Sequence, residues 1–291
     1  MTTDRMTTAR ERGRVAVITA VSGQHDELMG HVGGIAVGSR VPDLHVVIGM
    51  ADPDVSRGRL PITSDRWRTI TRAAQTTDPA RLPLAAARNL GATVAMDAGA
   101  DVLIFVSVRC IPGPRLVERY ADLVGTADHT APVLWCGEVR ELPPPSPVIG
   151  YPVYRLEPQA VDVEPLLPEG YREVEVASRA VFGDSFALTA EGFRGTGGFC
   201  PRFRGAEGVD EDFARVVSSA GGTVVRVGGV PAYRQFRPAA SPGEGDVHRL
   251  VRNANVFAER WGRTMSIEEW EALVATGVAQ RDEKRGRWVV A

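Results

Sequence analysis

Two groups of charged side chains have the types and spacing to do chemistry in this chain. Three consecutive carboxylates, Asp210, Glu211 and Asp212, lie at the start of a predicted helix. A positioned carboxylate can accept a proton during a reaction, although the helix dipole also favours acidic residues at a helix N-terminus that have no chemical role. Arg109 follows a predicted strand and Arg234 lies further along the chain, and guanidinium groups donate paired hydrogen bonds to phosphate oxygens. The pattern therefore allows both proton transfer and phosphate binding.

The composition limits the classes of protein to which the chain can belong. Of its 291 residues, 44% are hydrophobic and 24% are charged, which suits a globular α/β protein with a full core. The formal net charge is −2 and the basic residues are scattered, so we expect no nucleic-acid partner. Lys284 is the only lysine, so arginine is the general basic residue here and any single arginine is a weaker functional signal.

The cysteines and the N-terminal residues indicate the cellular compartment in which we expect the protein. Cys110, Cys136 and Cys200 are isolated and odd in number, which suits a reducing compartment and neither a disulfide framework nor a zinc site. The first 14 residues contain no apolar run typical of a signal peptide, and no run of about 18 apolar residues could cross a membrane. We therefore expect a cytoplasmic protein without a transmembrane segment.

Strand and helix patterns alternate along the first hundred or so residues. Short, continuously apolar runs predict strands at Val15–Val21, Leu44–Met50 and Val102–Val106. Helical patterns cover residues 26–37 and Leu84–Asp97. These units predict an α/β fold with a parallel sheet and right-handed crossovers, in which ligands bind outside the carboxyl ends of the strands.

The second half of the chain is less regular. A proline-rich stretch followed by an acidic segment predicts a surface loop or lid over residues 143–178. Beyond it, ordered structure resumes near Phe182. The predicted elements there are a strand at Phe182–Thr189, a helix at Asp212–Ala220, a strand at Thr223–Val227 and helices at Asp246–Trp261 and Ile267–Thr276.

Four blocks of sequence resemble those of family 2 nucleotide-sugar glycosyltransferases of the GT-A fold. The first is the helix segment LAAARNLGA, and the second is the strand and turn ADVLIFVSVRCIPGP. The third joins DSFALT, GGF, DEDF and AG, and the fourth is YRQFRP. The resemblance implies a GT-A-like fold with a central, mostly parallel sheet flanked by helices.

The resemblance covers most of the chain and suggests its organisation. The glycosyltransferase domain is expected at 14–262, between a flexible N-terminal tail at 1–13 and a C-terminal helical extension at 263–291. Within the domain we expect a nucleotide-binding half at 14–115, the loop or lid at 143–178 and an acceptor half at 179–240.

Site residues follow from the same alignment. It makes Asp210 the general base, with Glu211 and Asp212 beside it as further catalytic candidates, although an acidic helix start remains an equal explanation for those two. Asp52 precedes a proline and has an ordinary turn as its alternative. The implied donor-binding residues are Thr19, Ala20, Val21, Asp52, Arg88, Ser107, Arg109 and Arg234. The implied acceptor-binding residues are Asp184, Gly197, Gly198 and Phe199.

The chain departs from the family at the positions that normally bind a divalent metal. Ser107 and Arg109 occupy the Asp-x-Asp pair, and Arg234 occupies the position of a metal-binding histidine. We therefore expect no metal and no cofactor, with arginines supplying the positive charge. The hypothesis is an inverting glycosyltransferase that moves a sugar from a nucleotide-diphosphate sugar to a small-molecule or natural-product acceptor. The alternatives are a non-catalytic homologue that binds a nucleotide or partner, and a GT-A fold used for another transfer reaction.

Overall fold

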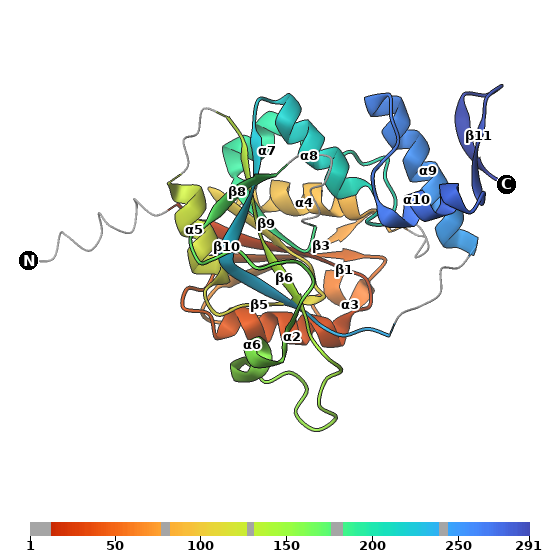
Figure 1. Ribbon diagram of the computed structural model, residues 1–291. Helices are drawn as coiled ribbons and strands as arrows, with labels where there is room; N and C mark the ends of the chain where they lie inside the picture. The colour runs from red at the N-terminus through yellow and green to blue at the C-terminus, as the bar shows by residue number, and fades with distance from the viewer. Residues whose placement is uncertain (1–12, 77–81, 127–130, 176–182, 239–243) are drawn as a thin grey trace, which may run out of the picture.

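A computed structural model describes residues 13–76, 82–126, 131–175, 183–238 and 244–291 (Figure 1). The predicted tail, 1–13, lies outside the described residues except for Gly13. Within the described ranges, no helix is long and apolar enough to cross a membrane.

The first half of the sheet is parallel, as the strand and helix patterns predict. Its strands run in the order β3-β2-β1-β4, and every neighbouring pair is parallel. The bounds are β1 at Val15–Val21, β2 at Leu44–Met50, β3 at Arg68–Ala74 and β4 at Val102–Val106. Every residue of β2 and β4 is buried, because helices cover both faces of this half. The predicted strands 15–21, 44–50 and 102–106 are confirmed; β3 was not predicted.

The second half of the sheet is mixed. It continues from β4 in the order β9-β6-β10-β5, with β9 antiparallel to both β4 and β6, and β10 parallel to β6. Two short strands, β7 and β8, pair with β6 and β10. The bounds are β5 at Cys110–Pro112, β6 at Val133–Glu141, β7 at Val161–Asp162, β8 at Arg172–Glu175, β9 at Ser185–Thr189 and β10 at Thr223–Arg234.

Helices cover both faces of the sheet (Figure 1). One apolar core packs α4 and α8 on one face, and a second packs α2 and α5 on the other. The bounds are α2 at His25–Ala36, α3 at Pro53–Ser56, α4 at Leu84–Asp97, α5 at Leu116–Gly125, a 3₁₀ helix η2 at Val153–Arg155, α6 at Leu156–Gln159, α7 at Ala190–Thr196, α8 at Val209–Ser219, α9 at Glu244–Trp261 and α10 at Glu268–Ala275.

The helix α4 lies close against β1 because of a glycine. A Cβ atom built on Gly91 would lie 2.4 Å from Cγ2 of Ile18, so a larger residue would push the helix or the isoleucine away. Arg88 and Asn89 precede this contact by less than one turn. The close packing therefore sets the depth at which α4 presents its polar residues at the sheet.

Two expectations about the chain's organisation need correction. The extension 263–291 is not only helical: after α10 it forms the hairpin of β11 (Ala279–Asp282) and β12 (Arg287–Val290). The ring of Trp288 packs edge-on against Trp270 at 5.0 Å, and the Asn255 side chain bonds both backbone groups of Trp288. Trp288, Val289 and Val290 are also residue types common in strands, a signal that the expectation of a helical extension overlooked.

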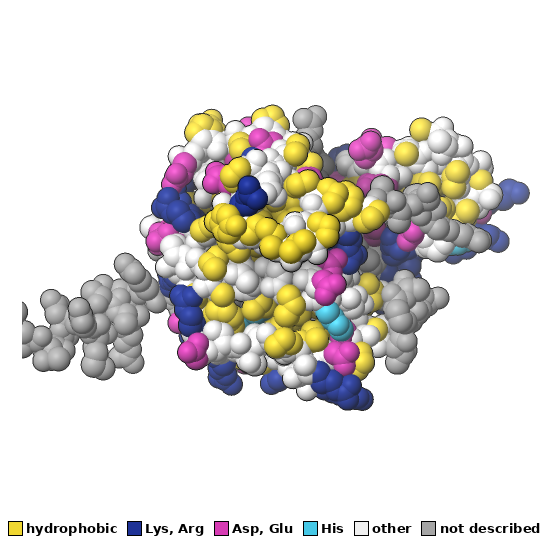
Figure 2. All heavy atoms as spheres, turned by 90° about the horizontal axis from the view of Figure 1, so that it is seen from below, with side chains coloured by type: hydrophobic (Ala, Val, Ile, Leu, Met, Phe, Trp, Pro, Cys, Tyr) yellow, Lys and Arg dark blue, Asp and Glu magenta, His cyan; other side chains and the backbone are white. Residues whose placement is uncertain are grey.

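The excursion 143–178 is also more ordered than a plain loop. Its described part contains η2, α6, β7 and β8, and its short strands extend the main sheet. In the view from below, Figure 2 shows hydrophobic side chains gathered into a broad patch on the face where α6 lies in Figure 1. The exposed large hydrophobic residues of the excursion include Val148, Ile149 and Tyr154.

Candidate functional site

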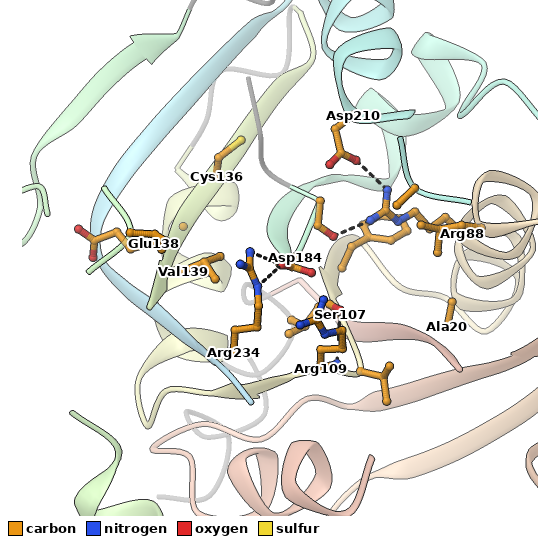
Figure 3. A pocket seen from close by; sticks show the side chains of 18 of the residues that line it. Ala20, Arg88, Ser107, Arg109, Cys136, Glu138, Val139, Asp184, Asp210 and Arg234 are labelled. Carbon is orange, nitrogen blue, oxygen red and sulfur yellow. Dashed lines mark hydrogen bonds and ion pairs between the residues drawn. The ribbon is translucent and has the colours of Figure 1, made fainter. Parts of the chain in front are cut away.

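A cavity of about 880 Å³ opens where β1, β2 and β4 end and crosses to β6 and β10 (Figure 3). Asp184, Ser107, Arg109 and Arg234 lie near its middle, with Asp210 and Arg88 beside them. Six of the predicted site residues therefore share one cavity, together with Ala20 at one end. The cavity is lined, among others, by Ile18, Ala20, Gln24, Met50, Leu82, Leu84, Arg88, Ser107, Arg109, Cys136, Glu138, Val139, Val163, Glu164, Pro165, Leu166, Asp184, Asp210, Arg226 and Arg234.

The strand β1 gives the cavity only every second side chain. Ile18 and Ala20 line it, whereas Thr19 and Val21 face the other side of the sheet. Thr19 is buried with its hydroxyl 3.0 Å from Nε2 of His31, and Val21 belongs to a separate apolar cluster. Alternation therefore directs the side chains of Thr19 and Val21, two of the predicted donor residues, away from the cavity.

Asp52 is used to cap a helix instead of lining the cavity. Its carboxylate accepts hydrogen bonds from the backbone amides of Val55 and Gly23, and lies 2.9 Å from Nε2 of His25. Burial opposes ionisation of Asp52, but these donors lower its pKa below the ordinary value. The turn that Asp52 and Pro53 predict is present, and Asp52, a predicted donor residue, does not line the cavity.

Asp210 and Arg88 form an ion pair at the cavity wall. Nη1 of Arg88 lies 3.0 Å from Oδ1 of Asp210, and Nη2 donates to the backbone oxygen of Gly183. The guanidinium also lies over the rings of Phe186 and Phe199, at 5.4 and 5.3 Å. The carboxylate also interacts with the backbone of Gly183, yet the Asp210 side chain stays 22% exposed and lines the cavity, so a ligand there can reach it.

The electrostatics of Asp210 suit a proton acceptor. Burial raises the pKa of Asp210, while the charge and hydrogen bond of Arg88 oppose that rise. A carboxylate with a raised pKa is a stronger base once it is ionised. Arg88 fixes the orientation of this carboxylate and favours its ionised form.

The two carboxylates after Asp210 do not line the cavity. Glu211 accepts a hydrogen bond of 2.7 Å from the backbone amide of Ser266 and pairs with Arg215. Asp212 accepts bonds from the side chains of Arg260 and Trp261, at 2.6 and 2.8 Å. Both tie α8 to the C-terminal region, so the structure gives neither of them a position for catalysis.

The loop after β4 presents the side chain of Arg109 to the cavity. The hydroxyl of Ser107 accepts from the backbone amide of Arg109, whose own carbonyl accepts from the amide of Gln235 at 2.8 Å. Nε of Arg109 is buried, and nothing in the described part of the chain accepts its hydrogen bond. The other arginines that line the cavity have carboxylate partners; for Arg109 none is seen among the described residues. Arg109 is therefore the arginine with charge available for an anion.

Arg234, unlike Arg109, is paired with carboxylates. Its Nε and Nη2 donate to Asp184 at 2.8 and 2.6 Å, and its Nη1 pairs with Glu141. Burial opposes its charge, but Asp184 raises the pKa of Arg234, so it stays cationic. Two carboxylates balance that charge, so Arg109 and Arg234 do not together supply the two free positive charges that the sequence suggested.

The residues at the family's metal positions do not fit a divalent ion. A guanidinium has no lone pair to donate, so Arg109 and Arg234 cannot act as ligands. In the described ranges, no group of three or more histidine, cysteine, aspartate or glutamate side chains is placed to hold a metal.

Among the predicted acceptor residues, only Asp184 lines the cavity. Gly197 ends α7 at φ +75° and Gly198 follows at φ +80°, where a side chain would be strained. The side chain of Asn89 bonds both backbone groups of Phe199, whose ring stacks on Phe213 at 4.0 Å. Gly197, Gly198 and Phe199 therefore turn the chain and fill the core, and none of these three predicted acceptor residues lines the cavity.

Several cavity residues gave no signal in the sequence. Apolar residues such as Met50, Leu82 and Leu84 look like any core residue. The strand β6, which supplies the far wall, was not predicted, because only Leu134, Trp135 and Cys136 of its nine residues are buried. Glu141, the second partner of Arg234, lies at the end of that strand.

Comparison of the folded chain with solved structures gives matches, whereas comparison of its sequence does not. No family model matches the chain, and no curated protein matches it. A crystal structure of GalNAc-T7 with UDP, GalNAc and Mn²⁺ aligns with 91% of this chain and 54% of its own, at 15% identity and a TM-score of 0.53. TarS from S. aureus, residues 1–349 in complex with UDP-GlcNAc, aligns with 89% of this chain and 69% of its own, at 11% identity and a TM-score of 0.54.

The chain spans about half the length of the GalNAc-T7 structure and 41% of the longer TarS structure. The similarity extends over nearly all of the present chain, including both halves of the sheet. The fold is therefore the GT-A fold of nucleotide-sugar glycosyltransferases, as the four sequence blocks implied.

Proposed function

We propose that the protein transfers a sugar from a nucleotide-diphosphate sugar to an acceptor hydroxyl, with inversion and without a divalent ion. The observation that carries the proposal is the meeting of Arg88, Arg109, Asp184 and Asp210 at one cavity of a GT-A fold, although they lie far apart in sequence. The structures of GalNAc-T7 with UDP and of TarS with UDP-GlcNAc make a nucleotide sugar the natural donor to propose.

Asp210 and Arg109 act directly in the proposed reaction. The acceptor oxygen attacks the anomeric carbon while Asp210 accepts its proton, and the bond from that carbon to the diphosphate oxygen breaks. The bonding electrons leave with the diphosphate, where Arg109 donates hydrogen bonds to the growing charge. Ala20, Met50 and the other apolar residues at the opposite end of the cavity would pack against the nucleoside.

Exchange of Asp210 for asparagine tests the base. Asp210→Asn should lower transfer by at least ~10²-fold, because the amide cannot accept the proton, while leaving the affinity for a nucleotide diphosphate unchanged. The matched control is Glu211→Gln on the same helix, which should retain the wild-type rate. The measurement is product formation from UDP-, GDP-, ADP- and TDP-sugars with a panel of acceptors.

The alternatives make different predictions in the same assay. Nucleotide binding without turnover for any donor in the wild type would favour a binding-only protein. An unchanged rate in Asp210→Asn would refute the assignment of the base.

Exchange of Arg109 for alanine tests the phosphate contact. One charge-assisted hydrogen bond is worth ~1.5–3 kcal/mol, so Arg109→Ala should weaken binding of a nucleoside diphosphate by about 10- to 100-fold and leave the nucleoside unaffected. Calorimetric titrations with UDP, UMP and uridine, each with EDTA and with excess Mn²⁺, separate these contributions. The control is Arg57→Ala, an exposed arginine away from the cavity.

Metal dependence is decided by the same titrations. Equal affinity for UDP with EDTA and with Mn²⁺ is expected, since neither Ser107 nor Arg109 offers a carboxylate to the ion. Binding that requires Mn²⁺, or equal losses for all three ligands in Arg109→Ala, would contradict the proposed role of this arginine.

A further inference from the structure

The far end of the cavity has an unusual wall. It is formed by β6 from Cys136 onward and by the segment that follows β7. Figure 3 shows Cys136 and Val139 on the opposite side of Asp184 from Ala20. We call this wall the apolar arm; its residues are Cys136, Val139, Val163, Pro165 and Leu166. Val163 is 55% exposed and Leu166 is 42% exposed, so both present apolar surface to solvent in the cavity that Asp210 also lines.

The backbone of this segment is held firmly although its side chains are exposed. The carboxylate of Glu138 accepts hydrogen bonds from the amides of Leu167 and Gly229, at 2.8 and 3.1 Å. The carbonyl of Pro165 accepts from Arg226. A Cβ atom on Gly228 would lie 2.2 Å from the carbonyl oxygen of Pro168, so the chain passes very close to β10 here. Specific contacts thus fix exposed apolar side chains at the cavity wall.

The charged side chains around the apolar arm already have partners. Glu138 is bonded to two backbone amides, and Arg226 pairs with Glu164 at 3.4 Å in addition to its bond to Pro165. A charged ligand group placed here would have to displace one of these partners, whereas an apolar group would only displace water from Val163 and Leu166. The site therefore favours a neutral, apolar occupant.

We infer that the apolar arm binds the acceptor, and that the acceptor is a neutral, freely diffusing small amphiphile with its hydroxyl directed to Asp210 and its apolar body against Val163 and Leu166. The inference rests on the proposed function, since it names the class of the acceptor. The donor end cannot hold this body, because the proposal assigns its apolar wall, which includes Ile18, Ala20 and Met50, to the nucleoside.

A series of alkyl glucosides tests the inference without any need for turnover. Methyl, butyl, hexyl and octyl β-D-glucoside, kept below micelle-forming concentrations, are titrated by ligand-observed NMR against protein saturated with UDP. Burial of each methylene is worth ~4-fold in affinity, so burial of two or more makes the octyl glucoside bind at least ~10-fold more tightly than the methyl glucoside.

Paired variants locate the binding. Val163→Ser with Leu166→Ser should abolish the dependence on chain length, because it removes the exposed apolar wall and leaves the backbone bonds of Glu138 intact. Val148→Ser with Tyr154→Ser is the matched control: both residues are more exposed, and neither lines the cavity. The control should keep the full dependence on chain length.

Each outcome is decisive. No chain-length dependence in the wild type, a dependence that survives Val163→Ser with Leu166→Ser, or a loss in both paired variants would overturn the inference. Sedimentation with phosphatidylcholine vesicles that requires Val163 and Leu166 would also overturn it, in favour of a membrane-bound occupant. UDP affinity, measured separately without glucoside, tests the proposed function. UDP binding without chain-length dependence rejects only the inference. Chain-length dependence without UDP binding keeps an apolar binding site but rejects the proposed function, and with it the assignment of the bound amphiphile as the acceptor.

Discussion

Removal of the Arg88 side chain should move the pH at which the enzyme loses activity. In the wild type, Arg88 donates to Asp210 at 3.0 Å and opposes the rise in the pKa of this carboxyl that burial causes. Arg88→Met removes the opposing charge and its hydrogen bond, so that burial and the charge of Asp184 are opposed only by the backbone hydrogen bond of Gly183. The pKa of Asp210 then rises further, and the ionised base is present only at higher pH.

The magnitude follows from the contact that is lost. The two side chains are 9% and 22% exposed, so solvent screens their interaction only weakly. A charge-assisted hydrogen bond of ~1.5–3 kcal/mol divided by ~1.4 kcal/mol per pKa unit gives a rise of about one to two units. Arg88→Lys keeps the charge but not the planar pair of donors, so its shift should be smaller.

The assay is the pH profile of kcat/KM for transfer or for hydrolysis of the donor. Because the base must be deprotonated, activity falls as the pH drops through its pKa, and the acidic limb of the profile should move to higher pH by the same one to two units in Arg88→Met. Arg215→Met is the matched control, since Arg215 also pairs with a buried carboxylate on α8 and lies over a ring, that of Phe257. Its acidic limb should stay in place.

An acidic limb that does not move in Arg88→Met, or that moves to lower pH, would refute the reasoning. Loss of UDP affinity without a shift of the limb would instead make Arg88 a phosphate ligand, the role that the family resemblance gives it. Thermal denaturation at each pH ensures that the compared samples are folded.

Two further changes test the contacts that support the site. Asp212→Ala should lower the free energy of unfolding by about 2–3 kcal/mol, because it leaves the side-chain donors of Arg260 and Trp261 without their acceptor; urea denaturation measures the loss, and transfer per folded molecule should be unchanged. Gly91→Ala should cost about 1–3 kcal/mol in the same measurement, since the added Cβ overlaps Ile18 at the sheet, and wild-type stability would mean that α4 moves freely away from β1.

Apolar continuity in the sequence was enough to predict three of the four strands in the parallel half of the sheet; β3, whose residues are mostly not buried, gave no such pattern. The strands β1, β2 and β4 are short runs of buried residues, and the predicted bounds of all three and of α4 agree with the structure. Such runs report burial on both faces, which is why they are recognisable without any tertiary information. The carboxyl ends of these strands then gave the place of the cavity.

The sequence could not predict the direction of individual side chains. In a continuously apolar strand, nothing distinguishes Ala20, which lines the cavity, from Thr19, which lies behind it. Consecutive residues of a helix point about 100° apart, so of the three adjacent carboxylates only Asp210 can face the cavity once α8 is docked. The rotation of α8 is set by its packing against the sheet.

Long-range pairing was decided by the tertiary structure alone. Arg234 is separated by 50 residues from Asp184 and by 93 from Glu141, and no local pattern reveals that these carboxylates balance its charge. The packing of Trp288 against Trp270 of α10 is likewise a tertiary contact that no local pattern reveals. The sequence by itself determined which charged residues the site could use. Only the folded chain determined that Arg234 is paired while Nε of Arg109 has no acceptor among the described residues, because burial and partners are properties of the assembled sheet.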